Sequence, residues 1–162
     1  MKTYIMKQKL IALGGKFDIY DEEENPVYQV EGSFLKIPKS YQVKRDGVVI
    51  TTIRKKVVSL FPTFYIESDG EVIATIKKRL SFIKAKYDIE AHGITVKGSV
   101  LDMDFQVFKD GELVGEINQQ WLKLTSTYAI HIYDPKMEGF MISICVAIDN
   151  AKESEDRATD LI

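Results

Sequence analysis

Turn-forming dipeptides recur along this chain between short apolar-rich runs, and their spacing limits the possible folds more than any other feature. Asp46-Gly47 and Asp69-Gly70 lie 23 residues apart, His92-Gly93 follows after another 23, and Asp110-Gly111 after 18. The Asp-Gly dipeptide favours the type I′ hairpin turn, because both of its residues tolerate positive φ. The sequence therefore predicts a series of β-hairpins.

The runs between these turns alternate in the way that half-buried strands do. From Ile83 to Glu90 every odd position is apolar or aromatic and every even position is charged, so one face is buried and the other meets water. Many short strands at hairpin spacing indicate a sandwich or a closed barrel. The twelve strands are expected at 3–8, 16–20, 26–32, 39–44, 48–54, 63–67, 72–79, 85–90, 94–100, 103–108, 112–120 and 122–133.

One segment near the C-terminus has no such alternation. Asp134-Pro135 ends the last strand, and almost every residue from Phe140 to Ile148 is apolar. A helix that is apolar on all sides must be buried on all sides, so we expect an axial helix at about residues 137–150, inside an all-β barrel. A buried central strand is the competing interpretation, because Ile and Val favour strands. Residues 151–162 are polar and acidic and are expected to form a frayed tail.

Length and composition bound the class of protein. The chain has 162 residues, which suits one domain, placed here at 1–150. Its net charge of −2 argues against a general nucleic-acid binder. The apolar run near the N-terminus is shorter than the about 7–15 apolar residues of a secretory signal. The apolar runs elsewhere are shorter than the about 20 residues of a membrane-spanning helix. We therefore expect a cytoplasmic protein with no transmembrane segment.

The small net charge conceals an uneven distribution. Residues 36–97 carry a net charge of +7, whereas residues 1–35 carry −2 and residues 98–162 carry −7. Two clusters, Arg54-Lys55-Lys56 and Lys77-Lys78-Arg79, each end a predicted strand and are expected at one rim of the barrel. Converging Arg and Lys side chains suit phosphate groups. The alternative is that these lysines only protect exposed strand edges from aggregation.

Motifs for metal or phosphate chemistry are weak. Gly14-Gly15-Lys16 lacks the earlier Gly and the following Ser or Thr of a phosphate-binding loop, so it predicts a turn. His92 and His131 have no nearby pair of cysteines, so no zinc site is expected and surface roles are predicted for both. No cofactor is expected.

Candidate catalytic residues are equally sparse. Cys145 is the chain's one cysteine, which excludes an intrachain disulfide, and its apolar surroundings predict a buried, unreactive thiol. Asp102 and Asp104 share one strand face by spacing, but nothing else marks a cleft, and a solvated or turn role is expected. A hydrolase that uses Cys145 or this Asp pair is the third function class, and we expect a protein that is not an enzyme.

Twelve hairpin strands followed by one apolar helix resemble the tubby-like architecture, a closed antiparallel barrel around its own hydrophobic helix. A more specific resemblance is carried by Tyr4–Lys9, Phe17–Tyr20, the hairpins of the middle and Ile144–Asp149. In these residues the chain resembles a bacterial member of the LURP-one-related family, relatives of tubby C-terminal domains and of phospholipid scramblases. It covers roughly residues 1–150.

The resemblance implies membrane-related functions. Tubby domains bind phosphoinositide headgroups through basic residues, and scramblases act on membranes. The counterpart of the scramblase calcium segment, Asp149–Glu153, lacks the central Gly and alternating acids of a calcium loop, so scrambling is not expected.

These observations lead to one expected function and two alternatives. We expect a non-enzymatic binding or scaffold module, peripheral at the membrane, that recognises anionic phospholipid headgroups. The residues expected to bind them are Arg54, Lys55, Lys56, Lys77, Lys78 and Arg79. The alternatives are a β-barrel carrier with a small apolar ligand inside, and a structural protein that binds an unidentified protein. An axial helix would leave no room for an internal ligand.

Overall fold

Twelve strands and one long helix make up the computed structural model, which describes residues 1–7, 15–33, 40–79, 86–120 and 127–159. The strands are β1 (Lys2–Lys7), β2 (Lys16–Asp21), β3 (Pro26–Gly32), β4 (Ser40–Arg45), β5 (Val48–Lys55), β6 (Thr63–Ser68), β7 (Glu71–Arg79), β8 (Lys86–Glu90), β9 (Ile94–Ser99), β10 (Asp104–Lys109), β11 (Glu112–Gln120) and β12 (Thr127–Ile132). The 3₁₀-helix η1 (Pro135–Met137) leads into α1 (Glu138–Thr159). The predicted all-β class with one helix is confirmed, and the strand bounds agree within a few residues. Residues 122–126, the predicted start of the last strand, lie outside the described residues.

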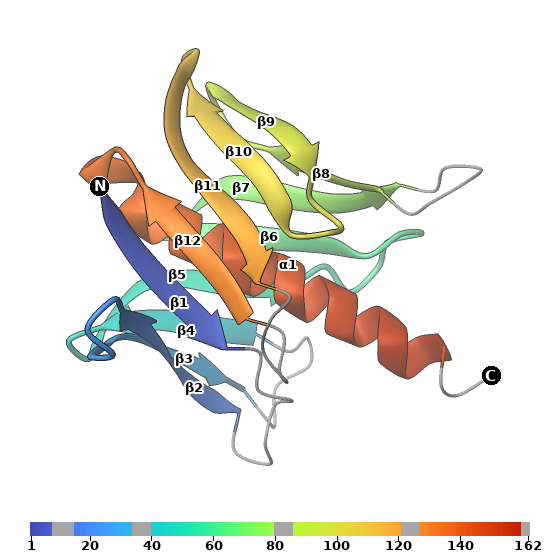
Figure 1. The fold of residues 1–162 in the computed structure, drawn as a ribbon. Coiled ribbons are helices and arrows are strands. Elements are labelled where there is room, and N and C mark those ends of the chain that lie inside the picture. The colour runs from blue at the N-terminus through green and yellow to red at the C-terminus, as the bar shows by residue number, and fades with distance from the viewer. Residues whose placement is uncertain (8–14, 34–39, 80–85, 121–126, 160–162) are drawn as a thin grey trace.

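All strands belong to one antiparallel sheet, in the order β8-β7-β6-β5-β4-β3-β2-β1-β12-β11-β10-β9 (Figure 1). The first strand pairs with the last, with Lys2 opposite Ile132, and this pairing curls the sheet into a barrel. Within the described residues no pairing joins β8 to β9, the two ends of the order. The barrel is therefore nearly closed, with a seam between β8 and β9.

The Asp-Gly dipeptides form the turns that the sequence predicts. Asp46 and Gly47 have φ values of 51° and 78°, and Asp69-Gly70 and Asp110-Gly111 repeat this pair of positive values. Because successive strands are antiparallel, the connections 22–25, 46–47, 69–70, 91–93 and 110–111 all lie at one end of the barrel. We call this the hairpin end, and the opposite end the loop end.

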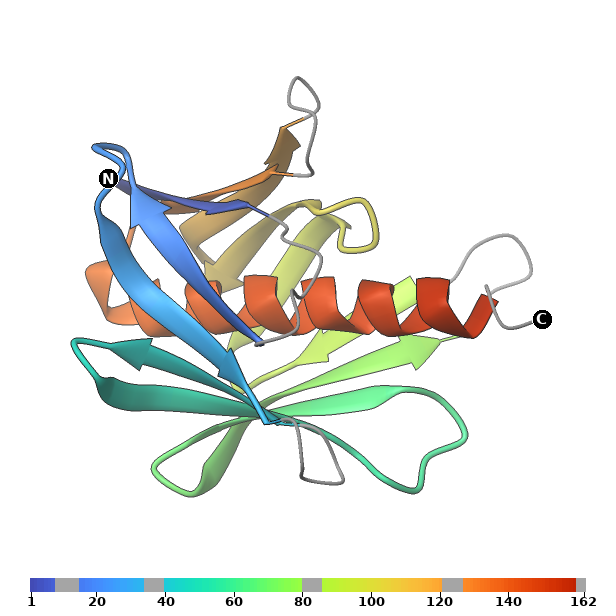
Figure 2. The same ribbon diagram turned by 90° about the horizontal axis from the view of Figure 1, so that it is seen from below.

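Helix α1 follows the barrel axis from the hairpin end to the loop end (Figure 2). Asp134 caps the preceding η1 by accepting a hydrogen bond from the Lys136 N–H at 2.9 Å, and Pro135 occupies the favoured first position. Every side chain from Met141 to Ile148 is completely buried. The helix rather than the competing strand is therefore confirmed, and the barrel core forms between its apolar side chains and the inward-facing residues of the strands.

The helix is longer than predicted. It continues to Thr159, so the expectation of a frayed tail from residue 151 is wrong for residues 151–159. The physical reason is that this stretch is rich in Ala, Glu, Lys and Arg, which all have high helix propensity, and a helix that is already formed extends at little cost. Ala151 is still fully buried, so the barrel holds the helix beyond the predicted end.

Candidate functional site

The two predicted basic clusters meet at the loop end. Strands β5 and β7 run in the same direction on either side of β6, so their C-terminal ends lie about 10 Å apart, two strand spacings. The Lys56 N–H donates to the Thr63 carbonyl oxygen at 2.8 Å, and Thr63 pairs with Lys77. The structure therefore brings both clusters to one rim. We call their residues the basic edge: Arg54, Lys55, Lys56, Lys77, Lys78 and Arg79.

Half of the basic edge is already neutralised by ion pairs on the outer face of the sheet. Lys77 Nζ lies 2.7 Å from Glu90 Oε2, and Arg79 pairs with Asp88, so both cations link β7 to β8. Arg54 pairs with Glu67 on the neighbouring strand β6 in the same way. Such cross-strand pairs support the sheet, and they reduce the charge that these residues offer to a ligand.

The charge that remains available lies at the start of the β5–β6 connection. Lys55 and Lys56 are both exposed, and neither makes an ion pair with any residue that the structure describes. Lys78 is half-buried, and its backbone N–H donates to the Pro62 carbonyl oxygen at 3.0 Å. Lys55 and Lys56 are therefore the strongest candidates for contact with an anion.

Directly after these lysines the chain exposes a group of apolar side chains that the sequence analysis did not single out. Val57, Val58 and Leu60 are 66%, 84% and 95% exposed, and Phe61 is partly exposed. We call residues 57–61 the apolar loop. The sequence could have indicated this loop, because residues 57–61 are mostly apolar although they connect two strands, where polar turn residues are usual.

The base of this loop is held by hydrogen bonds. Ser59 Oγ lies 3.2 Å from Thr63 Oγ1, and Thr63 Oγ1 donates to the Phe61 carbonyl oxygen at 3.1 Å. Together with the backbone bonds of Lys56 and Lys78, these contacts fix both ends of the connection to β6 and β7. The exposed apolar side chains are therefore presented from a supported loop.

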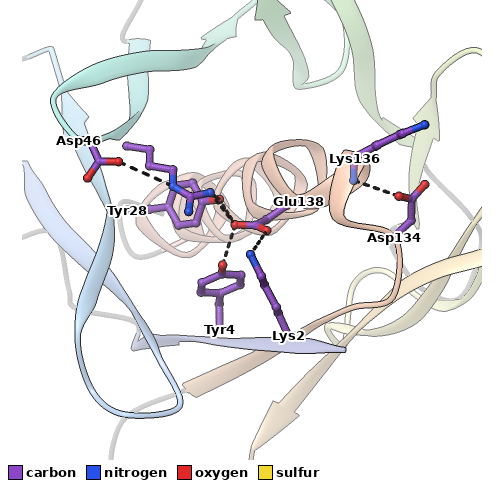
Figure 3. A network of polar contacts seen from close by, with 8 residues as sticks. Lys2, Tyr4, Tyr28, Asp46, Asp134, Lys136 and Glu138 are labelled. Carbon is purple, nitrogen blue, oxygen red and sulfur yellow. Dashed lines mark hydrogen bonds and ion pairs between the residues drawn. The ribbon is translucent and has the colours of Figure 1, made fainter.

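A second polar cluster lies at the hairpin end around Glu138, the first residue of α1 (Figure 3). Oε1 of Glu138 accepts hydrogen bonds from Tyr4 Oη at 2.6 Å, Tyr28 Oη at 2.5 Å and Arg45 Nη1 at 2.9 Å. Oε2 accepts from Lys2 Nζ at 3.1 Å. The network joins β1, β3 and β4 to the start of the helix through Glu138, a residue that is only 5% exposed.

Electrostatics in this network favour the charged carboxylate. Burial alone would raise the pKa of Glu138, but hydrogen bonds from Tyr28, Tyr4 and Lys2 together hold the pKa below that of an ordinary Glu. Burial and the hydrogen bond to Glu138 raise the pKa of both tyrosines. Since four protein donors already engage the carboxylate, we assign it a structural role, as the anchor of the helix.

The cysteine and the two histidines lie on different elements of the fold: Cys145 on α1, His131 on β12 and His92 between β8 and β9. Cys145 is completely buried, and burial raises the pKa of its thiol, so the reactive thiolate is suppressed. His131 lies on β12, where Nδ1 is 3.1 Å from Thr3 Oγ1. His92 is exposed in the β8–β9 turn, and its carbonyl oxygen accepts a hydrogen bond from Lys109 Nζ at 2.7 Å.

The Asp pair occupies a turn and the start of a strand. Asp102 Oδ2 accepts from Ser99 Oγ at 2.6 Å, within the turn between β9 and β10, and Asp104 Oδ1 accepts from Asn118 Nδ2 at 2.8 Å on the neighbouring strand β11. Each carboxylate thus has a local structural partner. These contacts are of the turn and edge type that the sequence predicts for this pair.

The candidate phosphate loop is only partly described. Gly14 lies outside the described residues, whereas Gly15 has a φ of 58° and accepts a hydrogen bond at its carbonyl oxygen from the Gly32 N–H at 2.7 Å. Lys16 begins β2, and its Nζ lies 3.1 Å from Glu31 Oε1. The described part of the motif therefore fits the predicted turn.

Concave surface is found along the seam between β8 and β9. A cleft of about 900 Å³ is lined by apolar and polar residues of β7, β8, β9 and the turn between β8 and β9, by Lys109 of β10, and by Met137 of η1 and Phe140 of α1. A second cleft of about 520 Å³ follows the same seam toward the loop end. Both are open grooves beside the helix, whereas α1 itself occupies the axis, the space that the alternative carrier would need for its ligand.

No helix among the described residues is long and apolar enough to cross a membrane.

Comparison with known proteins identifies the family. Residues 2–149 match the LURP-one-related family. The uncharacterized protein YxjI of Bacillus subtilis (strain 168) is 30% identical over 150 residues, which are 91% of each chain. The X-ray structure of a protein from Arabidopsis thaliana has the same fold, with a TM-score of 0.63 and 18% identity over 93% of this chain and 91% of that one. The chain belongs to the LURP-one-related family.

Proposed function

We propose that this protein is a non-enzymatic module that docks its basic edge on anionic phospholipid at a membrane surface. The observation that carries the proposal is the pair of exposed lysines, Lys55 and Lys56, which make no ion pair among the described residues. Ammonium groups that have no protein partner are available for lipid phosphates and carboxylates.

The distribution of acidic groups favours one orientation on such a surface. The hairpin end carries exposed carboxylates in its turns, among them Asp46, Asp69 and Asp110. An anionic surface repels these turns and attracts the lysines at the loop end. The molecule would therefore approach with the loop end first.

The expected strength is modest. Each Lys near an anionic membrane contributes about 1 kcal/mol, so Lys55 and Lys56 together give about 2 kcal/mol, or roughly a 30-fold increase in partitioning. Salt screens this attraction over about 8–10 Å. Binding should be reversible, salt-sensitive and dependent on lipid charge.

Co-sedimentation with lipid vesicles tests the proposal. Wild type should pellet with vesicles of phosphatidylcholine and phosphatidylserine at low salt, and remain in the supernatant with phosphatidylcholine alone. Lys55→Glu/Lys56→Glu should lose the binding, whereas the control Lys97→Glu/Lys136→Glu, with the same change in net charge away from the basic edge, should keep it. Phosphatidylinositol phosphate at matched total charge distinguishes headgroup recognition from charge alone.

The results that contradict the proposal are specific. If wild type fails to pellet with every anionic vesicle, or if the two double variants bind equally, the basic edge is no lipid site. The lysines would then have only the protective role at strand edges, and the alternative of a protein partner would stand.

A further inference from the structure

We infer that the apolar loop inserts into the bilayer beneath the headgroups that the lysines bind, an inference that rests on the proposed function. Val58 and Leu60 are 84% and 95% exposed, and Val57 stands beside them in the same connection. Single exposed apolar residues are ordinary on protein surfaces, but a contiguous group indicates an interaction site. The ligand class is therefore a lipid bilayer, and a soluble phosphate compound would satisfy only half of this surface.

The order of residues along the connection matches the layers of a membrane. Lys55 and Lys56 come first, at the rim of the barrel, and the apolar side chains follow them into the loop. Cations at the level of the headgroups with apolar side chains at the boundary of the acyl chains are the arrangement of interfacial membrane anchors.

The hydrogen bonds at the base of the loop support insertion. Thr63 Oγ1 donates a hydrogen bond to the Phe61 carbonyl oxygen at 3.1 Å, and the Lys78 N–H donates one to the Pro62 carbonyl oxygen at 3.0 Å. Because these bonds order the connection before binding, little conformational entropy is lost when it enters the lipid.

The positive charge of Lys55 and Lys56 favours a bilayer over a second copy of this chain as the partner of the apolar loop. Two copies that met symmetrically through their apolar loops would bring Lys55 and Lys56 of both copies together, since a two-fold interface pairs the same surface with itself. Like charges at such a contact repel. An anionic bilayer offers complementary charge, so the observations favour the bilayer as the occupant.

A position-specific fluorescent probe tests insertion directly. Val58→Cys carrying a nitrobenzoxadiazole label should show brighter, blue-shifted emission on phosphatidylserine vesicles, and lipids with a spin label near the headgroup should quench it. Cys145 is completely buried, so the label should react at the introduced thiol. The matched control is Val48→Cys, 65% exposed at the hairpin end, whose label should not respond.

Binding of loop variants separates the inference from the proposed function. Full transfer of one Val or Leu side chain from water to an apolar medium strengthens partitioning by about tenfold or more. Val58→Ser/Leu60→Ser should therefore bind phosphatidylserine vesicles at least about tenfold more weakly, and its residual binding should be more salt-sensitive. The control Val48→Ser/Val72→Ser changes two exposed valines at the hairpin end and should bind as wild type does.

Each other outcome overturns the insertion. If the lysine variant loses binding while Val58→Ser/Leu60→Ser binds normally and the probe is silent, insertion is wrong and the proposed function stands. If no protein binds any vesicle, both fail. If wild type sediments as a dimer without lipid and the loop variant as a monomer, the loop is a contact between copies of this chain.

Discussion

Replacement of Glu138 by Leu tests whether one carboxylate fixes the helix inside the barrel. The side chain is buried and accepts hydrogen bonds from Tyr4, Tyr28, Arg45 and Lys2. Leucine has a similar size and removes every acceptor. The substitution therefore changes the polar contacts with little change in volume.

The expected cost comes mainly from the two tyrosines. Their hydroxyls would remain buried without an acceptor, and each unsatisfied group costs about 1–3 kcal/mol. Arg45 and Lys2 are about half exposed and can turn to water, so the loss of their ion pairs adds only about 0–1 kcal/mol each. Glu138→Leu should lower the free energy of unfolding by about 3–5 kcal/mol, a large share of the about 5–15 kcal/mol of an ordinary domain.

Urea unfolding followed by far-UV circular dichroism measures this loss. With a slope of about 2 kcal/mol per molar urea, the midpoint should fall by about 1.5–2.5 M. The triple variant Glu138→Leu/Tyr4→Phe/Tyr28→Phe removes the stranded hydroxyls and should recover much of the stability, because an apolar replacement of both partners is nearly neutral. An unchanged midpoint for Glu138→Leu, or no recovery in the triple variant, would show that the network does not anchor the helix.

Three further predictions address the charge of this anchor, the buried helix and one strained glycine. Because the pKa of Glu138 is lowered in the folded state, the stabilisation that its charged carboxylate gives is present above the pKa of Glu138 in the unfolded chain and is lost as the pH falls through its pKa in the folded protein. As the pH falls below about 5, the melting temperature of Glu138→Gln should therefore decrease less than that of wild type. Ile144→Asp buries an unpaired charge against the core and should yield insoluble or unfolded protein, so that a soluble variant with native circular dichroism would contradict the axial helix. Gly98→Ala would place its Cβ 2.6 Å from the Asp104 carbonyl oxygen at a φ of +112°, and it should lower the free energy of unfolding, measured in urea, by about 1–3 kcal/mol. This loss should exceed that of the control Gly47→Ala, whose Cβ meets nothing within 4 Å. Equal losses in the two variants would refute the clash.

The strands were predictable because their signals are local. A two-residue turn with positive φ at both positions requires residues such as Asp and Gly, and Asp46-Gly47 and Asp69-Gly70 meet that requirement at the observed turns. The alternation of the flanking runs then selects the buried face. The helix was predictable for the opposite reason, since the segment from Phe140 to Ile148 lacks alternation and is apolar on every side.

The anchor at Glu138 was not predictable, because its partners are distant in sequence. Lys2, Tyr4, Tyr28 and Arg45 come from three different strands. Only the register of the sheet and the position of the helix bring them to one carboxylate. No local pattern indicates such a set, and Glu138 by itself is indistinguishable from an exposed acidic residue in the first turn of a helix.

Register also divides the basic edge into two parts. The sequence predicts that Arg54 and Lys55 share a cluster, and the structure places them on opposite faces of β5, since successive side chains alternate. Arg54 therefore meets Glu67 on the neighbouring strand, whereas Lys55 meets no acidic group among the described residues. The position of both clusters at the ends of predicted strands predicted the shared rim, but only the pairing of strands determines which of the charges at that rim remain available.

The alternation of connections along the barrel explains why the lysines and the apolar loop occur at the loop end. Tight turns at the hairpin end are restricted to residues that tolerate positive φ, and three of them use Asp, which places carboxylates there. The β5–β6 connection, residues 56–62, is longer, so its sequence is free of that restriction and can carry binding residues. The same turn chemistry that makes the barrel thus places carboxylates at the hairpin end. Under the proposed function, this distribution favours an approach to an anionic membrane with the loop end, where Lys55, Lys56 and the apolar loop lie together.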